Sequence, residues 1–449
     1  MHGCGEFGVE GLDSAEVMHA HFPKEWMSCQ NAEGHWLPDA IPYNQTYKFH
    51  HLWYETPQGG LEPWIQKSHA YQRFALRHIG EAFRRDNLCV TCAIHLFIDA
   101  FPSNWMKTIM DFHRKPKGGY FGIKEAFAPL AVSIRTDRFS WYPGETLEAE
   151  AWVANDTSLQ SNQHTLHYEI TDAAGALLAS GGQAASIQPC RADYQGSISV
   201  EIPANIDRRS TLGIVLTLVD EHGKAIHQSR QEITVFPRPK VSDFSIFPIA
   251  GSETQEADRI IEFLGCKPAP SADQAAVILC DDPAAFVEQR DALLDAVRRG
   301  ARLVLLTLPI GRHSFGDTEL EVIETGMAER HALSRATGHP AVQDLEENDI
   351  RFLHNEDLGY IAPFCRSCIL PAEGLRPILV TGTGNSGFGG PDRWIPVVAA
   401  GEIQHGKGSI FICQLDLGNR VATNASAGVL AASLLQVNTP SPAMASPIP

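Results

Sequence analysis

Apolar positions in the first 130 residues form two kinds of pattern, a helical period and a continuous run. In residues 61–86 the apolar side chains recur every three or four positions, which keeps one stripe of an amphipathic helix facing a neighbouring surface. A continuous apolar run at 88–99 is typical of a buried strand, and a second helical stretch ends near Phe127. With a further strand at the start of the chain, the predicted order is strand, helix, strand, helix. This order is typical of the last part of a (β/α)8 barrel, the TIM barrel.

The period changes to two from about residue 131. Apolar and polar residues alternate at 147–153 and again at 198–202, as in strands with one buried face. Aspartate-to-glycine segments at 172–175 and 220–223 lie between such runs and predict hairpin turns, because glycine readily adopts a positive φ. Strands of this length over residues 131–237 are typical of an immunoglobulin-like β-sandwich.

Apolar strands alternate with helical stretches in residues 241–436. The predicted strands are 276–280, 303–306, 377–380 and 409–413, and the predicted helices include 286–297 and 422–435. This order predicts an open α/β sheet with helices on both faces. Residues 437–449 are rich in Pro, Ser and Ala and predict a disordered tail.

These patterns predict a multidomain protein of the α/β plus β class. Its predicted parts are the C-terminal part of a barrel (1–130), a sandwich (131–237), an α/β domain (241–436) and the tail (437–449).

Composition and charge narrow the classes of partner. The chain has 449 residues, 44% of them hydrophobic, and a formal net charge of −17. Such a charge disfavours nucleic acid and anionic membranes as partners. No apolar run reaches the length of a membrane span and no signal peptide opens the sequence, which leaves cytoplasmic, periplasmic and secreted locations open.

The candidate chemistry lies at the start of the chain. Residues 3–13 read GCGEFGVEGLD, in which Glu6 is followed by a bulky aromatic residue and set among glycines. This setting suits the end of a barrel strand, where the backbone turns sharply and a side chain faces a ligand. The alternative is an ordinary surface carboxylate in a glycine-rich turn.

Two motifs resemble glycoside hydrolase family 2, which contains β-galactosidases, β-glucuronidases and β-mannosidases. GEFGVEGLD (5–13) is similar to the family's seventh-strand motif, in which the glutamate is the nucleophile. IDAFPSNWMKTIMDFHRKPKGGYFGIKEAFAPLAVSI (98–134) resembles its eighth strand and last helix. The resemblance implies a retaining glycosidase that hydrolyses terminal β-linked sugars through a glycosyl-enzyme. It makes Glu6 the nucleophile, with His95, Asp99 and Trp105 contacting the substrate.

The sequence also departs from that family. His95 stands where many members have a tryptophan that forms the floor of the sugar site, so the resemblance does not indicate which sugar binds. Nothing upstream of Glu6 matches the family's acid/base glutamate, which follows an asparagine after strand four. We therefore expect Met1 to be a truncated start within a longer reading frame and the isolated chain to be inactive. The alternative is a catalytically silent chain that acts as a carbohydrate-binding or assembly module.

Other motifs add no cofactor or metal to this picture. The pairs Cys89/Cys92 and Cys365/Cys368 lie too far apart in the sequence for a shared zinc site to be the favoured interpretation. Gly382 opens a GTGNSG fingerprint, but the following FGGP sequence disrupts the helix that would bind a dinucleotide. The α/β part resembles amidotransferase-like accessory domains, yet Leu306 is not followed by a nucleophile elbow. The expected partner is a carbohydrate, with no cofactor and no metal; a homo-oligomer stays open.

Overall fold

The computed structural model describes residues 1–22, 61–102, 107–240, 245–251, 255–324, 333–383 and 395–436. These residues form two compact units. Unit 1 comprises residues 1–136, 144–204 and 210–234, and unit 2 comprises 137–143, 205–209 and 235–449. Trp105, the glycine-rich segment 384–387 and the tail 437–449 lie outside the described residues, as do the histidines and tryptophans of segment 23–60.

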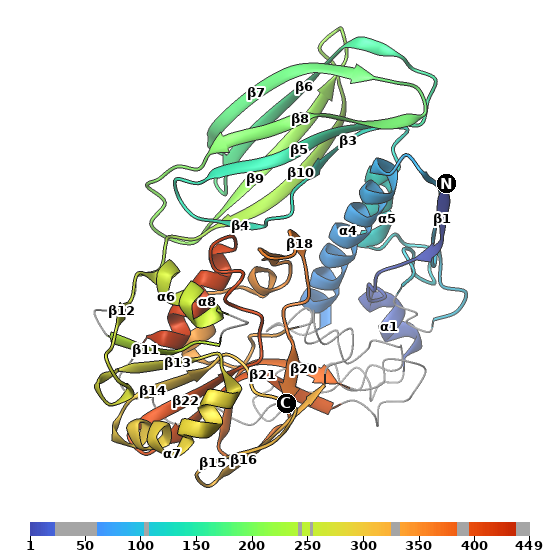
Figure 1. Ribbon diagram of the computed structural model, residues 1–449. Helices are drawn as coiled ribbons and strands as arrows, with labels where there is room; N and C mark the ends of the chain where they lie inside the picture. Colours follow the sequence, from blue (N-terminus) through green and yellow to red (C-terminus); the bar gives the residue numbers. More distant parts are fainter. Residues whose placement is uncertain are drawn as a thin grey trace. The chain divides into compact units, whose positions relative to one another are not determined.

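Unit 1 begins with a strand–helix–strand–helix arrangement. Strand β1 (His2–Phe7) pairs in parallel with β2 (Cys89–Ile94). Helix α4 (Leu61–Arg85) connects them, and α5 (Gly118–Ala126) lies beside α4 (Figure 1). The short helix α1 (Ala15–His21), which the sequence analysis did not predict, follows Ser14, whose side chain caps it by accepting a hydrogen bond from the Val17 amide. The described residues contain two parallel strands of this kind and no closed barrel, so the barrel stays a prediction.

The remainder of unit 1 is antiparallel. One sheet consists of β3 (Leu130–Arg135), β5 (Thr146–Asn155) and β8 (Arg191–Glu201). Strands β10 (Ala225–Val235), β9 (Ser210–Val219), β6 (Ser161–Asp172) and β7 (Leu177–Ile187) lie side by side in that order in a second sheet, which packs on the first (Figure 1). Gly175 and Gly223 have φ values of 84° and 81°, which confirms the two predicted hairpin turns.

Unit 2 contains a large mixed sheet. Its parallel part runs in the order β12 (Lys267–Pro268), β11 (Ser245–Ile249), β13 (Val277–Cys280), β14 (Arg302–Leu305) and β22 (Gly408–Cys413). Its antiparallel part continues with β21 (Ile395–His405), β19 (Ser367–Ile369), β16 (Thr318–Glu324) and β15 (Gly311–Phe315), while β20 (Leu375–Thr383) pairs with β21. Short elements complete the unit: β4 (Ser140–Trp141), η2 (Ala272–Gln274), η3 (Pro340–Val342), η4 (Glu347–Ile350), β17 (His354–Asn355) and β18 (Tyr360–Ile361).

Helices cover both faces of the parallel part, as the alternation of strands and helices predicted. Successive residues of β13 point to opposite faces, so Val277 and Leu279 pack with α6 (Glu256–Leu264) and α8 (Ala425–Leu435), whereas Ile278 packs with α7 (Pro283–Arg299). Strand β14 leads into β15 and not into a helix, in agreement with the predicted lack of a nucleophile elbow. The protein is therefore a multidomain α/β plus β protein with several separate sheets.

Candidate functional site

The carboxyl end of β1 is held against the end of β2 by backbone contacts. The amide of His95 donates a hydrogen bond of 2.7 Å to the carbonyl oxygen of Phe7. The ring of Phe7 packs edge-on against Phe83 of α4, with 5.2 Å between the ring centroids. A Cβ atom on Gly8 would lie 2.1 Å from the His95 carbonyl oxygen, so only glycine permits this approach. In the Glu-Phe-Gly sequence, Phe7 is therefore explained by its packing against α4, and Gly8 by the close approach of the His95 backbone.

Glu6 and His95 meet at this edge, although 88 residues separate them in the sequence. The distance between Glu6 Oε2 and His95 Nδ1 is 3.5 Å. The Glu6 side chain is 73% exposed and that of His95 is 33% exposed. Glu6 is thus accessible to a solute, while His95 limits its orientation.

Asp99 occupies a different environment. Its side chain is almost completely buried, and its Oδ2 atom accepts a hydrogen bond of 2.9 Å from Thr108 Oγ1. Lys117 Nζ lies 3.4 Å from the same oxygen. Burial raises the pKa of Asp99 to about 7, with a contribution from neighbouring Asp13, and this outweighs the opposing effect of Lys117. In this structure Asp99 contacts protein groups, and its contact with a sugar stays a prediction, as does that of Trp105.

Lys117 is the centre of this buried polar cluster. Its Nζ atom lies 2.7 Å from Asp13 Oδ1, and it donates hydrogen bonds to Thr108 Oγ1 (2.7 Å) and the Gly11 carbonyl (3.1 Å). One ammonium group therefore connects the loop after β1, the segment after β2 and the start of α5. Lys117 lies in the stretch that resembles the family's eighth strand and last helix, but a single lysine before two glycines carries no signal of burial, so the sequence predicts no role for it.

Gln72 of α4 supports the same two segments. Its buried amide nitrogen donates to the carbonyl oxygens of Val9 (3.0 Å) and Thr108 (2.9 Å), and its Oε1 atom accepts from the Gly119 amide (3.0 Å). The loops that follow β1 and β2 are thus fixed to the helix that joins these strands. This framework holds the surroundings of Glu6 and His95 without itself offering an exposed reactive group.

The raised pKa of Asp99 predicts a pH-dependent effect of the substitution Asp99→Asn. Between pH 4 and 7 folded Asp99 retains a proton that the unfolded chain has lost, so the free energy of unfolding decreases as the pH rises through this window. Asparagine has no such proton. The stability of Asp99→Asn relative to the unmodified protein should therefore improve from pH 5 to pH 8, by at most about 1.4 kcal/mol per pH unit.

Urea unfolding of both proteins at the two pH values measures this difference. Glu81, whose pKa burial raises to about 7, and His78, whose pKa burial lowers to about 4, titrate in both proteins, so their contributions cancel in the comparison. If the free energies of unfolding of Asp99→Asn and the unmodified protein differed by the same amount at pH 5 and pH 8, this would contradict the raised pKa of Asp99.

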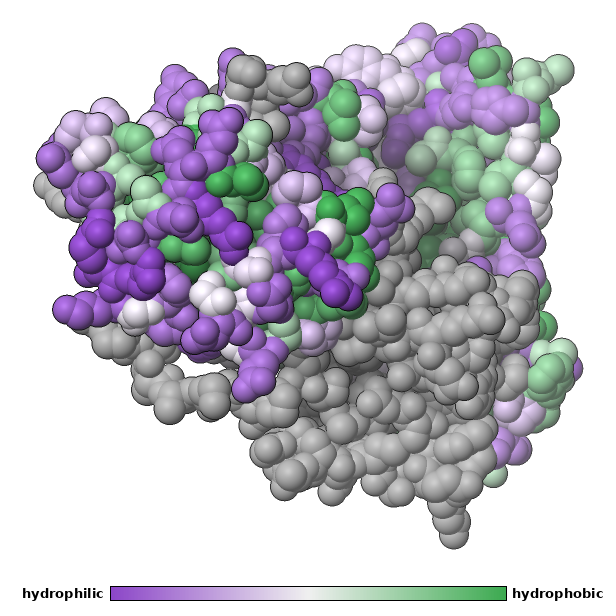
Figure 2. All heavy atoms as spheres, turned by 60° about the horizontal axis from the view of Figure 1, so that its bottom comes forward, coloured by the Kyte–Doolittle hydropathy of each residue, from purple (hydrophilic) through white to green (hydrophobic). Residues whose placement is uncertain are grey.

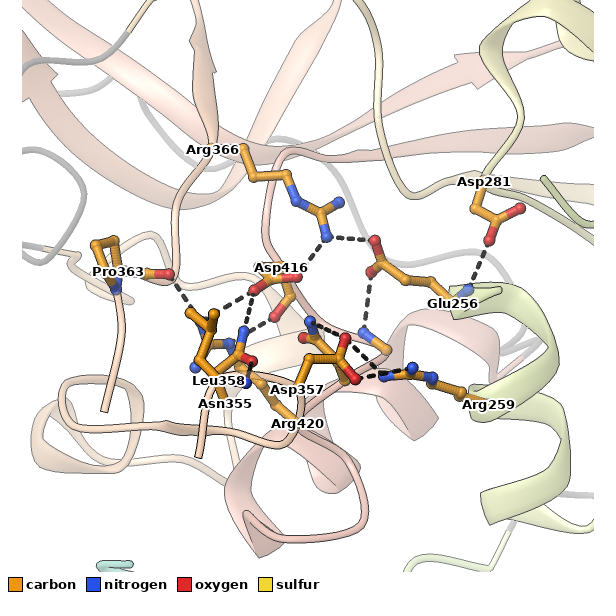
Figure 3. A network of polar contacts seen from close by, with 12 residues as sticks. Glu256, Arg259, Asp281, Asn355, Asp357, Leu358, Pro363, Arg366, Asp416 and Arg420 are labelled. Carbon is orange, nitrogen blue, oxygen red and sulfur yellow. Dashed lines mark hydrogen bonds and ion pairs between the residues drawn. The ribbon is translucent and has the colours of Figure 1, made fainter. Parts of the chain in front are cut away.

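Unit 2 carries a second polar cluster, at the carboxyl ends of β11, β13 and β22 (Figure 3). The Asp281 carboxylate accepts hydrogen bonds from the amides of Gly251 (2.5 Å), Glu256 (2.7 Å) and Ala257 (3.1 Å). It therefore occupies the position at the start of α6 that an anionic ligand would take. Arg366 contacts both Glu256 and Asp416. These groups satisfy one another, and the cluster is best explained as a stabilising network.

None of the described helices is both long and apolar enough to cross a membrane. Within the same residues no group of three or more His, Cys, Asp or Glu side chains could hold a metal ion. On the face drawn in Figure 2, hydrophilic residues cover most of the described surface, with small hydrophobic patches between them.

Comparisons with known proteins give partial similarities to solved structures. No family model matches the sequence, and no curated protein matches it. A β-D-mannosidase from Dictyoglomus thermophilum is similar at 18% identity and a TM-score of 0.39, over 55% of this chain and 29% of that one. An exo-β-D-glucosaminidase is similar at 16% identity and a TM-score of 0.37, over 50% and 26% of the two chains.

A β-glucuronidase from glycoside hydrolase family 2 is similar at 13% identity and a TM-score of 0.20, over 37% of this chain and 18% of that one. In all three cases the matched part is less than a third of the other chain.

Proposed function

We propose that this chain supplies the nucleophile of a retaining β-glycosidase, and that Glu6 is that nucleophile. The observation that supports the proposal is the exposed carboxylate of Glu6 at the carboxyl end of β1, 3.5 Å from His95 at the end of the parallel strand β2. Active sites of (β/α)8 barrels lie at this end of their strands. The barrel and the family 2 relationship are part of the proposal.

The proposed reaction has two steps. Glu6 attacks the anomeric carbon, its new C–O bond replaces the bond to the leaving oxygen, and a glycosyl-enzyme forms. Water then attacks the same carbon, gives a proton to the second carboxyl group described below, and releases Glu6 as a carboxylate. His95 restricts the orientation of the carboxylate by the contact between Nδ1 and Oε2. A second carboxyl group, about 5 to 5.5 Å from the first, must protonate the leaving oxygen. We place it outside the described residues.

Substrates with different leaving groups test whether Glu6 acts as the nucleophile while a separate group acts as the general acid. Dinitrophenolate departs without protonation, whereas a simple alkoxide needs a general acid. Because we expect the acid/base carboxyl group to be missing, the isolated chain should be inactive on substrates whose leaving group needs a general acid, such as the methyl β-glycosides of gluco, galacto and manno configuration. The corresponding 2,4-dinitrophenyl β-glycosides are the exception, because dinitrophenolate needs no acid, and from these the chain should release dinitrophenolate. Glu6→Gln should abolish the dinitrophenolate release.

Glu10→Gln is the matched control, since Glu10 lies in the same segment and has no part in the proposed reaction. It should leave the release unchanged. Equal release by the Glu6→Gln variant and the unmodified chain, or equal loss in both variants, would contradict the role of Glu6.

A further inference from the structure

Two cysteines of unit 2, Cys365 and Cys368, lie in contact in the hydrophobic core. The Sγ atoms of Cys365 and Cys368 are 3.8 Å apart. Both residues belong to the hydrophobic core on the α6 and α8 face of the sheet. Cys368 is fixed by the pairing of β19 with β16, and Cys365 forms a β-bridge with Leu415. The two sulfurs are therefore held close by backbone on both sides.

We propose that Cys365 and Cys368 form an oxidisable pair that closes to a disulfide when the protein meets a peroxide. A disulfide needs its sulfurs at about 2.05 Å, so the pair must approach by roughly 2 Å, which is within the reach of side-chain rotation and a small backbone adjustment. In the reduced protein the Cys365 thiol donates a hydrogen bond of 3.1 Å to the Ser367 carbonyl, inside the same short segment.

The chemistry balances with hydrogen peroxide as the oxidant. The thiolate of one cysteine attacks the peroxide, so that an S–O bond forms, the O–O bond breaks and hydroxide leaves. The second sulfur then attacks the sulfenic sulfur, an S–S bond forms, and the S–O bond breaks with loss of water. In total, two thiols lose two hydrogens and one peroxide is reduced to two molecules of water.

Cys413 provides a comparison in the same core. It lies on β22 near Cys365, and burial raises the pKa of its thiol to about 12. It therefore stays protonated near neutral pH and reacts poorly with peroxide. The sulfurs of Cys365 and Cys368 lie 3.8 Å apart, so either one can resolve a sulfenic acid formed on the other.

Arg366 connects this pair to the charged cluster. It lies between the two cysteines, its amide donates to the Gln414 carbonyl (2.9 Å), and its guanidinium contacts Glu256 and Asp416. Drawing the flanking sulfurs together moves the backbone on both sides of Arg366. Oxidation is therefore expected to alter the cluster as well as the core, and to change the thermal unfolding midpoint of unit 2.

Peptide mapping of the full chain tests the proposal. The folded protein is treated with hydrogen peroxide, then unfolded, alkylated and digested with trypsin. Cleavage after Arg366 separates the two cysteines unless a disulfide joins them, so we expect two peptides linked through Cys365 and Cys368, with Cys413 alkylated. Thiol reductant should reverse the link. The Cys413→Ser variant should still form it, whereas Cys365→Ser should not.

Two results would overturn the proposal. One is complete alkylation of both Cys365 and Cys368 after peroxide treatment that oxidises the exposed Cys190. The other is a disulfide that joins either residue to a different cysteine. Circular dichroism of each variant before treatment confirms that it is folded.

Discussion

Replacing Lys117 by methionine is expected to destabilise unit 1 by about 3–5 kcal/mol, the usual cost of removing one partner of a buried ion pair. The ammonium group is almost completely buried, as are the carboxyl groups of Asp13 and Asp99 that it contacts. Without it, the two buried carboxyl groups face each other with no cation beside them. The Gly11 carbonyl and the Thr108 hydroxyl also lose their donor.

Chemical denaturation of Lys117→Met measures this loss, and Lys115→Met is the matched control. Lys115 lies two residues away, pairs with Glu16 and is 53% exposed. Exposed ion pairs contribute little, so the control should unfold close to the unmodified protein. Equal midpoints for the two variants would show that Lys117 does not hold the segments after β1 and β2 together.

Replacing Arg420 by methionine is expected to destabilise unit 2 by a similar amount, about 3–5 kcal/mol. Arg420 has a completely buried side chain that donates to the Leu353 carbonyl oxygen at 2.7 Å. It also donates to the Pro363 carbonyl oxygen at 2.7 Å and to Asp416 at 3.1 Å (Figure 3). Methionine fills much of the volume but removes these three hydrogen bonds from a region that excludes water.

Arg259→Met is the control within the same cluster. Arg259 pairs with Asp357 through two hydrogen bonds (2.9 and 3.1 Å), but it is 34% exposed and its partner 54%. Its loss should cost less than about 1 kcal/mol, the usual value of an exposed pair. If Arg259→Met and Arg420→Met lowered the unfolding midpoint of unit 2 equally, burial would not be the reason for the contribution of Arg420.

The part of the site formed by Glu6 and His95 follows from sequence patterns. The helical period of 61–86 and the apolar run at 88–99 predict a parallel strand pair, and parallel strands bring their carboxyl ends to one edge of a sheet. The resemblance of both segments to one family indicates which polar residues at that edge to consider. The structure places Glu6 and His95 together there, while the catalytic role of Glu6 stays a prediction.

The buried cluster around Lys117 could not be predicted in the same way. Lysine is a surface residue by default, and burial of Lys117 depends on Asp13 and Asp99, which come from loops without periodicity. Only the packing of these loops shows that Asp99 faces a cation inside the protein. A single sequence carries no direct signal of such long-range pairing.

The same limit applies to unit 2. Strong apolar runs identified β13, β14 and β22 together with α7, because central parallel strands are hydrophobic on both faces. In the antiparallel strand β16 apolar residues alternate with charged ones, and its partner β15 is mostly polar. This pattern is compatible with a hairpin that has one exposed face but does not indicate which sheet the hairpin joins. Pairing of β16 with β19 is a tertiary contact that the local pattern does not specify.

Covalent trapping of the glycosyl-enzyme tests the central claim most directly. A 2-deoxy-2-fluoro β-glycoside with a dinitrophenyl leaving group reacts with a retaining nucleophile without help from a general acid, and the fluorine slows release of the sugar. After incubation with the gluco, galacto and manno reagents, peptide mapping should find one fluorinated sugar on Glu6, and none in the Glu6→Gln variant. Attachment to another carboxylate, or no attachment with any of the three reagents, would contradict the assignment of Glu6 as a glycosidase nucleophile.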